Sequence, residues 1–109
     1  MIRTATMNDL KEVAEVERIC FPPAEAASEE SFAERLKYYP EHFWLLEEEG
    51  KLISFINGFV TDEMTIRDEM FADASMHNKD GAYQAIFGVN TLPEYRRQGY
   101  AATVMWHVI

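Results

Sequence analysis

The sequence has little of several residue types, and each shortage excludes a class of protein. Cys20 is the only cysteine among 109 residues, so no disulfide can form within the chain, which fits a reducing compartment. No apolar run approaches the roughly 20 residues of a membrane-spanning helix, and the first residues lack the apolar segment of a signal peptide. We therefore expect a cytoplasmic protein without a membrane partner.

Positive charge is also scarce. Lys and Arg number 10 against 19 Asp and Glu, which gives a net charge of −9. Because phosphate contacts made by basic side chains dominate the affinity for nucleic acids, we expect no nucleic-acid partner. An acidic protein attracts a cationic partner or substrate instead. The hydrophobic fraction of 48% is enough for a core, and the length suits one domain over residues 1–109.

Hydrophobic periodicity predicts an α/β protein built on a mixed sheet. Apolar alternation or apolar runs predict strands at 2–6, 42–50, 51–61 and 82–91. Apolar residues at helical spacing predict helices at 10–19, at 29–39 and from about Tyr100. Gly50 marks a hairpin turn between the second and third strands. The acidic segment 62–81 reads as a mobile connection with at most a short helical stretch around 64–71.

Capping residues mark where two of the helices begin. Thr6 or Asn8 can cap the first helix, and Asp9 stands three residues after Thr6, as in a capping box. Ser28 can cap the second helix, which two glutamates in its first turn favour further. Two prolines after Phe21 end the first helix, since proline cannot continue it.

The order strand, helix, helix, strand, strand, strand, helix leaves the last helix without a following parallel strand. The sequence ends in the apolar run "ATVMWHVI" with no helix stop signal. We therefore expect the N-terminal part of a longer domain, in which the apolar face of the last helix (Val104, Met105, Val108) lacks its cover. A chain with such a patch should form a homodimer, aggregate or belong to a longer chain.

Two arginines stand at an unfavourable place, directly before the last helix. Cations at a helix N-terminus are disfavoured by roughly 0.3–1 kcal/mol each, yet Arg96 and Arg97 occupy this position. A strand end, a loop and a helix N-terminus together present outward-pointing N–H groups, and Gly99 lets a ligand approach the backbone. A phosphate or pyrophosphate would make the arginines favourable. On charge alone, two solvated arginines explain the pattern equally well.

The sequence around these arginines resembles that of a known family. "RRQGYA" (96–101) is similar to the R/Q-x-x-G-x-G/A signature of the Gcn5-related N-acetyltransferases, and the preceding "VNTLPEY" also matches. The Lys-Ser/Thr of a Walker loop and the spacing of a dinucleotide-binding fold are absent. "VERICF" and "ERLKYYPEHFWLLEEEGKLISFINGFV" resemble the arylalkylamine (serotonin-type) branch of the family.

The resemblance implies an acyl-CoA N-acyltransferase fold that binds acetyl-CoA as co-substrate, with no metal. This chain would supply the first four strands and three helices, and the C-terminal strands would be missing. Backbone groups of Val89, Asn90 and Thr91 would contact the acetyl and pantetheine portion, although Val89 also reads as an ordinary core residue. Arg96 would add positive charge near the pyrophosphate. The residues that would hold the pyrophosphate are Arg97, Gln98, Gly99, Tyr100, Ala101 and Ala102. Phe21 and Pro22 would lie on a loop over the amine pocket, or belong to a plain connection between helices.

The resemblance fails at the proton acceptor. An alkylamine has a pKa near ~10 and must lose a proton before it attacks. The branch uses two histidines on the fourth strand, whose positions here hold Ala85 and Phe87. With Val89 these two residues should share one strand face and form a dry, apolar wall. The catalytic residues therefore stay unassigned, with His77 of the acidic loop or a water chain to an acidic residue as options.

The leading hypothesis is an N-acetyltransferase that moves an acetyl group from acetyl-CoA to a small primary amine, by direct attack in a ternary complex. The branch implies an arylalkylamine. Cys20 stands in the wrong place for a nucleophile. The alternatives are a non-catalytic acyl-CoA-binding module and an acidic interaction domain.

Overall fold

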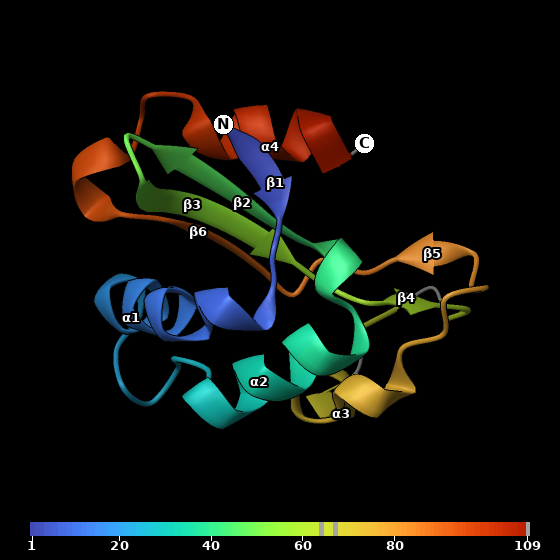
Figure 1. Cartoon of the computed structure of the whole chain (residues 1–109). Helices are drawn as coiled ribbons and strands as arrows, with labels where there is room; N and C mark the ends of the chain where they lie inside the picture. The colour runs from blue at the N-terminus through green and yellow to red at the C-terminus, as the bar shows by residue number, and fades with distance from the viewer. Residues whose placement is uncertain (64, 67, 109) are drawn as a thin grey trace.

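A four-stranded sheet forms the centre of the protein. The computed structural model describes residues 1–63, 65–66 and 68–108. The central strands are β1 (Ile2–Thr4), β2 (Phe43–Glu48), β3 (Lys51–Asn57) and β6 (Gly88–Thr91), which lie in the order β1-β2-β3-β6 (Figure 1). Each neighbouring pair is antiparallel.

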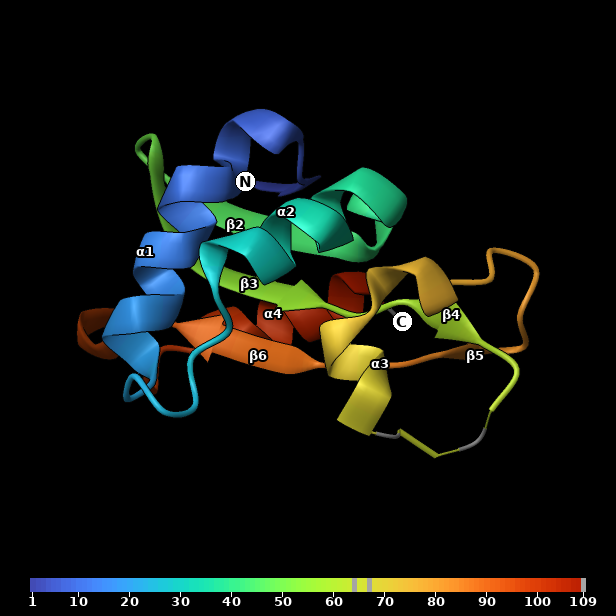
Figure 2. The same cartoon turned by 90° about the horizontal axis from the view of Figure 1, so that it is seen from below.

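Helices cover both faces of this sheet. α1 (Leu10–Cys20) and α2 (Glu29–Tyr38) lie on one face, and α4 (Tyr100–Val108) lies on the other (Figures 1 and 2). Between the sheet and the first two helices is a core that contains Val13, Phe32, Leu36, Phe43, Leu45 and Phe55. The predicted α/β class is therefore confirmed. No helix within the described ranges is long and apolar enough to span a bilayer.

The prediction of an uncovered last helix is wrong. Val104 is fully buried and belongs to a cluster with Leu46, Ile53 and Ile56 of the sheet. Met105 and Val108 pack against the same cluster. The reason is that α4 folds back onto the sheet face that α1 and α2 leave open, so its apolar side is covered within these residues.

The predicted capping groups hold the beginnings of two helices. The Thr6 N–H donates to Asp9 Oδ2 at 2.8 Å in a short 3₁₀ turn that leads into α1. Ser28 Oγ accepts from the Ser31 N–H at 3.1 Å at the start of α2. Arg3 of β1 binds both carboxylate oxygens of Asp9, at 2.9 and 2.7 Å. The contacts between Arg3 and Asp9 join the first strand to the turn that leads into the first helix.

The predicted hairpin is confirmed, but the two strands on either side of the acidic segment are not continuous. Glu49 and Gly50 at the β2–β3 turn have φ of +52° and +78°, which is typical of the tight turns that match strand twist. The expected strand 51–61 breaks after Asn57 and resumes as β4 (Val60–Thr61). The expected strand 82–91 divides into β5 (Tyr83–Gln84) and β6. β4 and β5 pair in a small separate sheet.

A close crossing at Gly58 explains this break. A Cβ atom on Gly58 would lie 1.8 Å from the Ala85 carbonyl oxygen, so only glycine fits there. The two chains stay bonded through the bend, because the Ala85 N–H donates to Phe59 O at 2.9 Å and the Phe87 N–H to Asn57 O at 2.8 Å. Both strands therefore leave the central sheet together.

Because of this bend, the prediction that Ala85, Phe87 and Val89 form one dry, apolar wall is wrong. Ala85 is buried in a satellite cluster with Tyr39 and Phe59, and Phe87 packs against that cluster. Val89 has a 42% exposed side chain and lines a different cavity, described below. The three side chains share no common surface.

The acidic connection is more ordered than expected. α3 (Asp68–Ala72) and a 3₁₀ turn (Ala74–Met76) follow one another there. Met70 and Ala74 pack in the satellite cluster with Tyr39 and Phe59. Of the predicted helical stretch at 64–71, the described helix covers residues from Asp68 onward, while Met64 and Arg67 lie outside the described residues.

Candidate functional site

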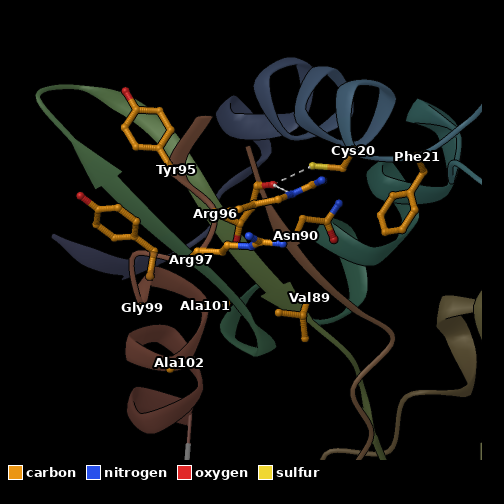
Figure 3. A pocket seen from close by; sticks show the side chains of 12 residues that line it. Cys20, Phe21, Val89, Asn90, Tyr95, Arg96, Arg97, Gly99, Ala101 and Ala102 are labelled. Carbon is orange, nitrogen blue, oxygen red and sulfur yellow. Dashed lines mark hydrogen bonds between the residues drawn. The ribbon is translucent and has the colours of Figure 1, made fainter. Parts of the chain in front are cut away.

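Two cavities meet beside β6. We call the first the outer cavity; it has a volume of about 350 Å³ and lies between the end of α1, β6 and the start of α4 (Figure 3). Its lining residues are Cys20, Phe21, Val89, Asn90, Thr91, Tyr95, Arg96, Arg97, Gly99, Tyr100, Ala101 and Ala102. All the predicted cofactor residues line it except Gln98, whose side-chain amide donates to Glu94 O at 3.2 Å. Of the two predicted substrate residues, Phe21 lines both cavities and Pro22 lines neither.

The backbone of the outer cavity is shaped to bind an anion. Arg97 and Gly99 have φ of +64° and +82°, and left-handed residues next to ordinary ones turn successive N–H groups into one concavity. The Thr103 N–H donates to Gly99 O at 2.9 Å, as the helix begins. The N–H groups of residues 100–102 precede that bond and have no helical partner. A Cβ atom on Gly99 would meet nothing within 4 Å, so its open side faces the cavity.

The two arginines differ in their surroundings. Arg96 Nε donates to Thr91 O at 3.1 Å, and the Cys20 thiol donates to the same oxygen at 3.3 Å (Figure 3). Arg96 therefore braces the loop against the end of β6. Arg97 extends from the loop toward Asn90 (Figure 3). Cys20 lies on the wall of the outer cavity, with its thiol bonded to the end of β6.

The second cavity, which we call the inner cavity, has a volume of about 520 Å³ and shares Phe21 and Asn90 with the outer one. It lies under the connection between α1 and α2. Its lining residues are Glu17, Phe21, Glu25, Ala26, Ala27, Ser28, Ser31, Arg35, Asn57, Phe71, Phe87, Gly88 and Asn90. Except for Phe21, Phe87 and Asn90, the sequence analysis did not assign these residues to the site.

Glu17 joins three elements at the wall of the inner cavity. Its side chain is buried, and one carboxylate oxygen accepts from Asn90 Nδ2 at 2.7 Å. The other oxygen accepts from the Ala27 N–H at 2.7 Å. Both carboxylate oxygens are thereby engaged, which fixes the α1–α2 connection over β6. A glutamate on the apolar stripe of α1, after Val13 and Ala14, was the signal in the sequence.

Arg35 is the buried cation of the inner cavity. Its side chain is only 5% exposed. Nη1 donates to Asn57 Oδ1 at 3.0 Å, and Nη2 donates to the Phe71 carbonyl at 3.1 Å. The guanidinium lies 5.2 Å from the ring centre of Phe32 and 5.5 Å from that of Phe87. Burial lowers the pKa of Arg35, while the charges of Tyr39 and Glu17 oppose this shift.

The histidines lie outside both cavities. His42 Nδ1 is 2.7 Å from Gln84 Oε1, and His77 Nδ1 accepts from the Val60 N–H at 3.0 Å. Burial lowers the pKa of His77, the nearby His42 lowers it further, and Glu41 opposes the shift. His107 is exposed on α4. In the described part of the chain, no three His, Cys, Asp or Glu side chains gather as a metal site requires.

These features agree with a family assignment made by comparison. The model of the acetyltransferase (GNAT) family matches residues 10–109, so the chain belongs to this family. No curated protein sequence matches it.

Solved structures support the fold. A GNAT-like decarboxylase, GphF, in complex with isobutyryl-CoA has 23% identity and a TM-score of 0.88, over 99% of this chain and 56% of its own. The loading GNATL domain of CurA from Lyngbya majuscula has 20% identity and a TM-score of 0.88, over 99% and 55%. The ribosomal-protein-S18-alanine N-acetyltransferase from Escherichia coli has 20% identity and a TM-score of 0.69, over 99% and 56%.

The chain thus spans about half the length of these solved structures. At such identities the likeness shows the fold alone. That fold is the mixed α/β acyl-CoA N-acyltransferase fold that the sequence analysis expected.

Proposed function

We propose that this protein binds acetyl-CoA in the outer cavity and transfers its acetyl group to a primary amine held in the inner cavity. The observation that carries the proposal is the contact of two differently built cavities at Asn90 and Phe21. One presents backbone N–H groups and two arginines, as a pyrophosphate requires. The other presents buried polar side chains between aromatic walls. Two solved structures of this fold, GphF and a diaminobutyrate acetyltransferase, are complexes with isobutyryl-CoA and with coenzyme A.

The strand β6 supplies the second half of the cofactor site in this proposal. It is the last strand of the described sheet, so one edge of its backbone faces the outer cavity without a neighbouring strand. The backbone groups of Val89 can therefore bond the amide groups of a pantetheine arm, as an added strand would, together with the N–H of Thr91, whose carbonyl already accepts from Arg96 and Cys20. Gly99, Ala101 and Ala102 leave room for the pyrophosphate, and Arg97 supplies charge.

The chemical step is a direct transfer. The amine nitrogen attacks the thioester carbon, the carbon–sulfur bond breaks, and CoA leaves as the thiol after gaining one proton. The amine must lose its proton first, since its ammonium form has no lone pair. No imidazole in the described residues lines either cavity. We propose a water chain that leads from the inner cavity to the exposed carboxylate of Glu25 on its rim.

The test is the release of free thiol from acetyl-CoA in the presence of amines, together with calorimetric titration of CoA. We expect saturable CoA binding and amine-dependent thiol release, with an arylalkylamine such as phenethylamine among the amines. CoA binding without thiol release from any amine would favour a binding module. The absence of CoA binding would overturn the proposal.

A second candidate is the decarboxylation of a carboxyacyl-CoA. It is favoured by the buried guanidinium of Arg35 on the inner cavity, a cation that suits the carboxylate of such an ester. In that reaction the bond to the carboxyl carbon breaks, CO₂ leaves, and the remaining carbon takes up a proton. Release of CO₂ from malonyl-CoA distinguishes it from amine acetylation.

A further inference from the structure

The inner cavity is lined by a positive charge, the Arg35 guanidinium, that has no ion-pair partner among the described residues. Arg35 is 95% buried and keeps its charge near neutral pH, because a guanidinium does not deprotonate in proteins. Its two hydrogen-bond partners are the amide oxygen of Asn57 and the carbonyl of Phe71, which are both neutral. Among the described residues, no carboxylate forms an ion pair with it. Its Nε atom, also buried, has no hydrogen-bond partner in the part of the chain that the structure describes.

This arrangement is costly for a purely structural residue. A buried ion is normally paired or fully hydrogen-bonded, since an unpaired charge loses several kcal/mol of hydration, on the order of the stability of a small domain. The charge of Glu17 acts on Arg35 without a contact, and both of its oxygens already accept hydrogen bonds from Asn90 and Ala27. Because its partners are neutral, the charge of the guanidinium stays uncompensated and can attract an anion placed in the cavity that Arg35 lines.

We infer that the inner cavity is a carboxylate-binding subsite, in which the Arg35 guanidinium, held by Asn57, binds a carboxylate of the substrate. This inference rests on the proposed function and narrows its substrate class. The aromatic walls formed by Phe21, Phe71 and Phe87 suit an apolar body between the reacting group and the carboxylate. The substrate class is thus an amino carboxylate with an apolar body, rather than a simple amine.

The same carboxylate chemistry has one other source. The carboxylate can belong to the acceptor amine, or it can belong to the acyl group of the CoA ester, as in malonyl-CoA. The net charge of −9 repels both kinds of anion at long range. Recognition therefore depends on this one buried cation, where the low dielectric strengthens a charge-assisted hydrogen bond.

The experiment compares ligand pairs that differ only in a carboxylate. L-phenylalanine is compared with phenethylamine, and 5-aminopentanoate with pentylamine, as acceptors for acetyl-CoA. Malonyl-CoA is compared with acetyl-CoA by calorimetry. Binding of L-phenylalanine to the CoA-saturated protein is also measured by calorimetry, so that the test does not depend on turnover. We expect at least a tenfold preference for the carboxylated member in the acceptor arm, or in the CoA arm if the acyl group carries the carboxylate.

Asn57→Asp is the decisive variant. It keeps the size of Asn57 and the acceptor for Arg35 Nη1, so it should fold, but it places an anion against the guanidinium. The preference should fall to less than about twofold. Arg35→Met should have the same effect, through a higher KM for the carboxylated acceptor. Arg18→Lys is the matched control, because Arg18 is an exposed arginine of α1 whose partner is Glu15, and it should leave the preference unchanged.

The outcomes separate the two proposals. If phenethylamine is acetylated but neither arm shows a preference, the carboxylate subsite is wrong and the proposed function stands. The subsite is also wrong if a preference survives Asn57→Asp. If CoA does not bind at all, the proposed function fails, while calorimetric titration of the protein alone with L-phenylalanine still decides the subsite. Binding that Asn57→Asp abolishes supports it, and no binding refutes it.

Discussion

The outer and inner cavities adjoin, yet different kinds of chemical group line them. The outer cavity presents main-chain N–H groups and two exposed arginines, nearly all from one stretch of chain, 89–102. The polar side chains that the inner cavity presents from α1, α2, β3 and β6 are buried; they are Glu17, Arg35, Asn57 and Asn90. A backbone site accepts any ligand with the right anionic group, whereas buried charged side chains bind one shape and charge. The contrast assigns general cofactor recognition to the outer cavity and substrate selection to the inner one.

The sharpest test of the outer cavity is Gly99→Val. A β-branched side chain at φ of +82° strains the loop and enters the open side of the glycine, so we expect at least a 100-fold loss of CoA affinity by calorimetry. Arg96→Ala should weaken binding less, because Arg96 also braces Thr91. Gly50→Val is the matched control, since Gly50 has φ of +78° and equally open space in the remote hairpin. Equal CoA affinity in the wild type and Gly99→Val would refute the site.

The inner cavity is tested by Glu17→Gln, which we expect to act on stability. Gln has one carbonyl oxygen, so either Asn90 Nδ2 or the Ala27 N–H loses its acceptor. Leaving such a donor buried without a partner costs about 1–3 kcal/mol of unfolding free energy, measured by urea denaturation. Glu15→Gln on the same helix should cost less than about 0.5 kcal/mol, because Glu15 is exposed. If the two variants are equally stable, Glu17 does not hold the cavity together.

Two substitutions of Arg97 distinguish the contribution of its charge to CoA binding from the contribution of its backbone conformation to stability. Arg97→Ala and Arg97→Gly both remove the guanidinium and should weaken CoA binding by about tenfold, the loss of one charge-assisted contact. Because Arg97 has φ of +64°, the Gly variant should be about 0.5–1 kcal/mol more stable than the Ala variant. Calorimetry and thermal melts measure the two effects. CoA affinities that differ between the variants in step with their stabilities would contradict the role of charge.

The smallest effect on catalysis is expected from His77, which belongs to neither cavity. His77→Ala should change kcat/KM by less than the 10²–10⁴-fold that follows the loss of a general base, and the pH–rate profile should show no inflection near ~6.5. An inflection near neutrality that His77→Ala removes would make this histidine the base.

His77 should instead affect how stability depends on pH. Its pKa is lowered in the folded state, so its contribution is fully present above the unfolded value of about 6.5 and is lost as pH falls below it. The wild type should therefore lose more thermal stability between pH 7.5 and 5.5 than His77→Gln, whose side chain can still accept from Val60 but does not titrate.

The sequence predicts local features of this molecule well. The hairpin at Gly50, the cap at Ser28 and the loop before α4 depend on residues within a few positions of each other, so their physical reasons are visible in a short stretch. The inner cavity is different, because the partners of Arg35 come from β3 and from α3. Spacing along the chain contains no information on which distant atoms meet.

Some of what was missed did leave a trace in the sequence. Glu17 and Arg35 each stand at a core position of a helix, beside Val13 and Ala14 in one case and Phe32 and Leu36 in the other. A charged residue on an apolar stripe points to a buried polar contact. The strand break had a weaker signal in Gly58, since a glycine within an apolar strand often marks a close backbone approach.

The bonds from α1 to β6 also have a consequence for how the protein folds. Glu17 and Asn90 are 73 residues apart in the chain, and Cys20 and Thr91 are 71 apart. Closing a loop of this length costs roughly 4 kcal/mol of chain entropy beyond a constant, far more than one hydrogen bond returns. These contacts therefore assemble late, after the hairpin and the first helices. Substitutions that weaken them should speed unfolding and leave the folding rate nearly unchanged.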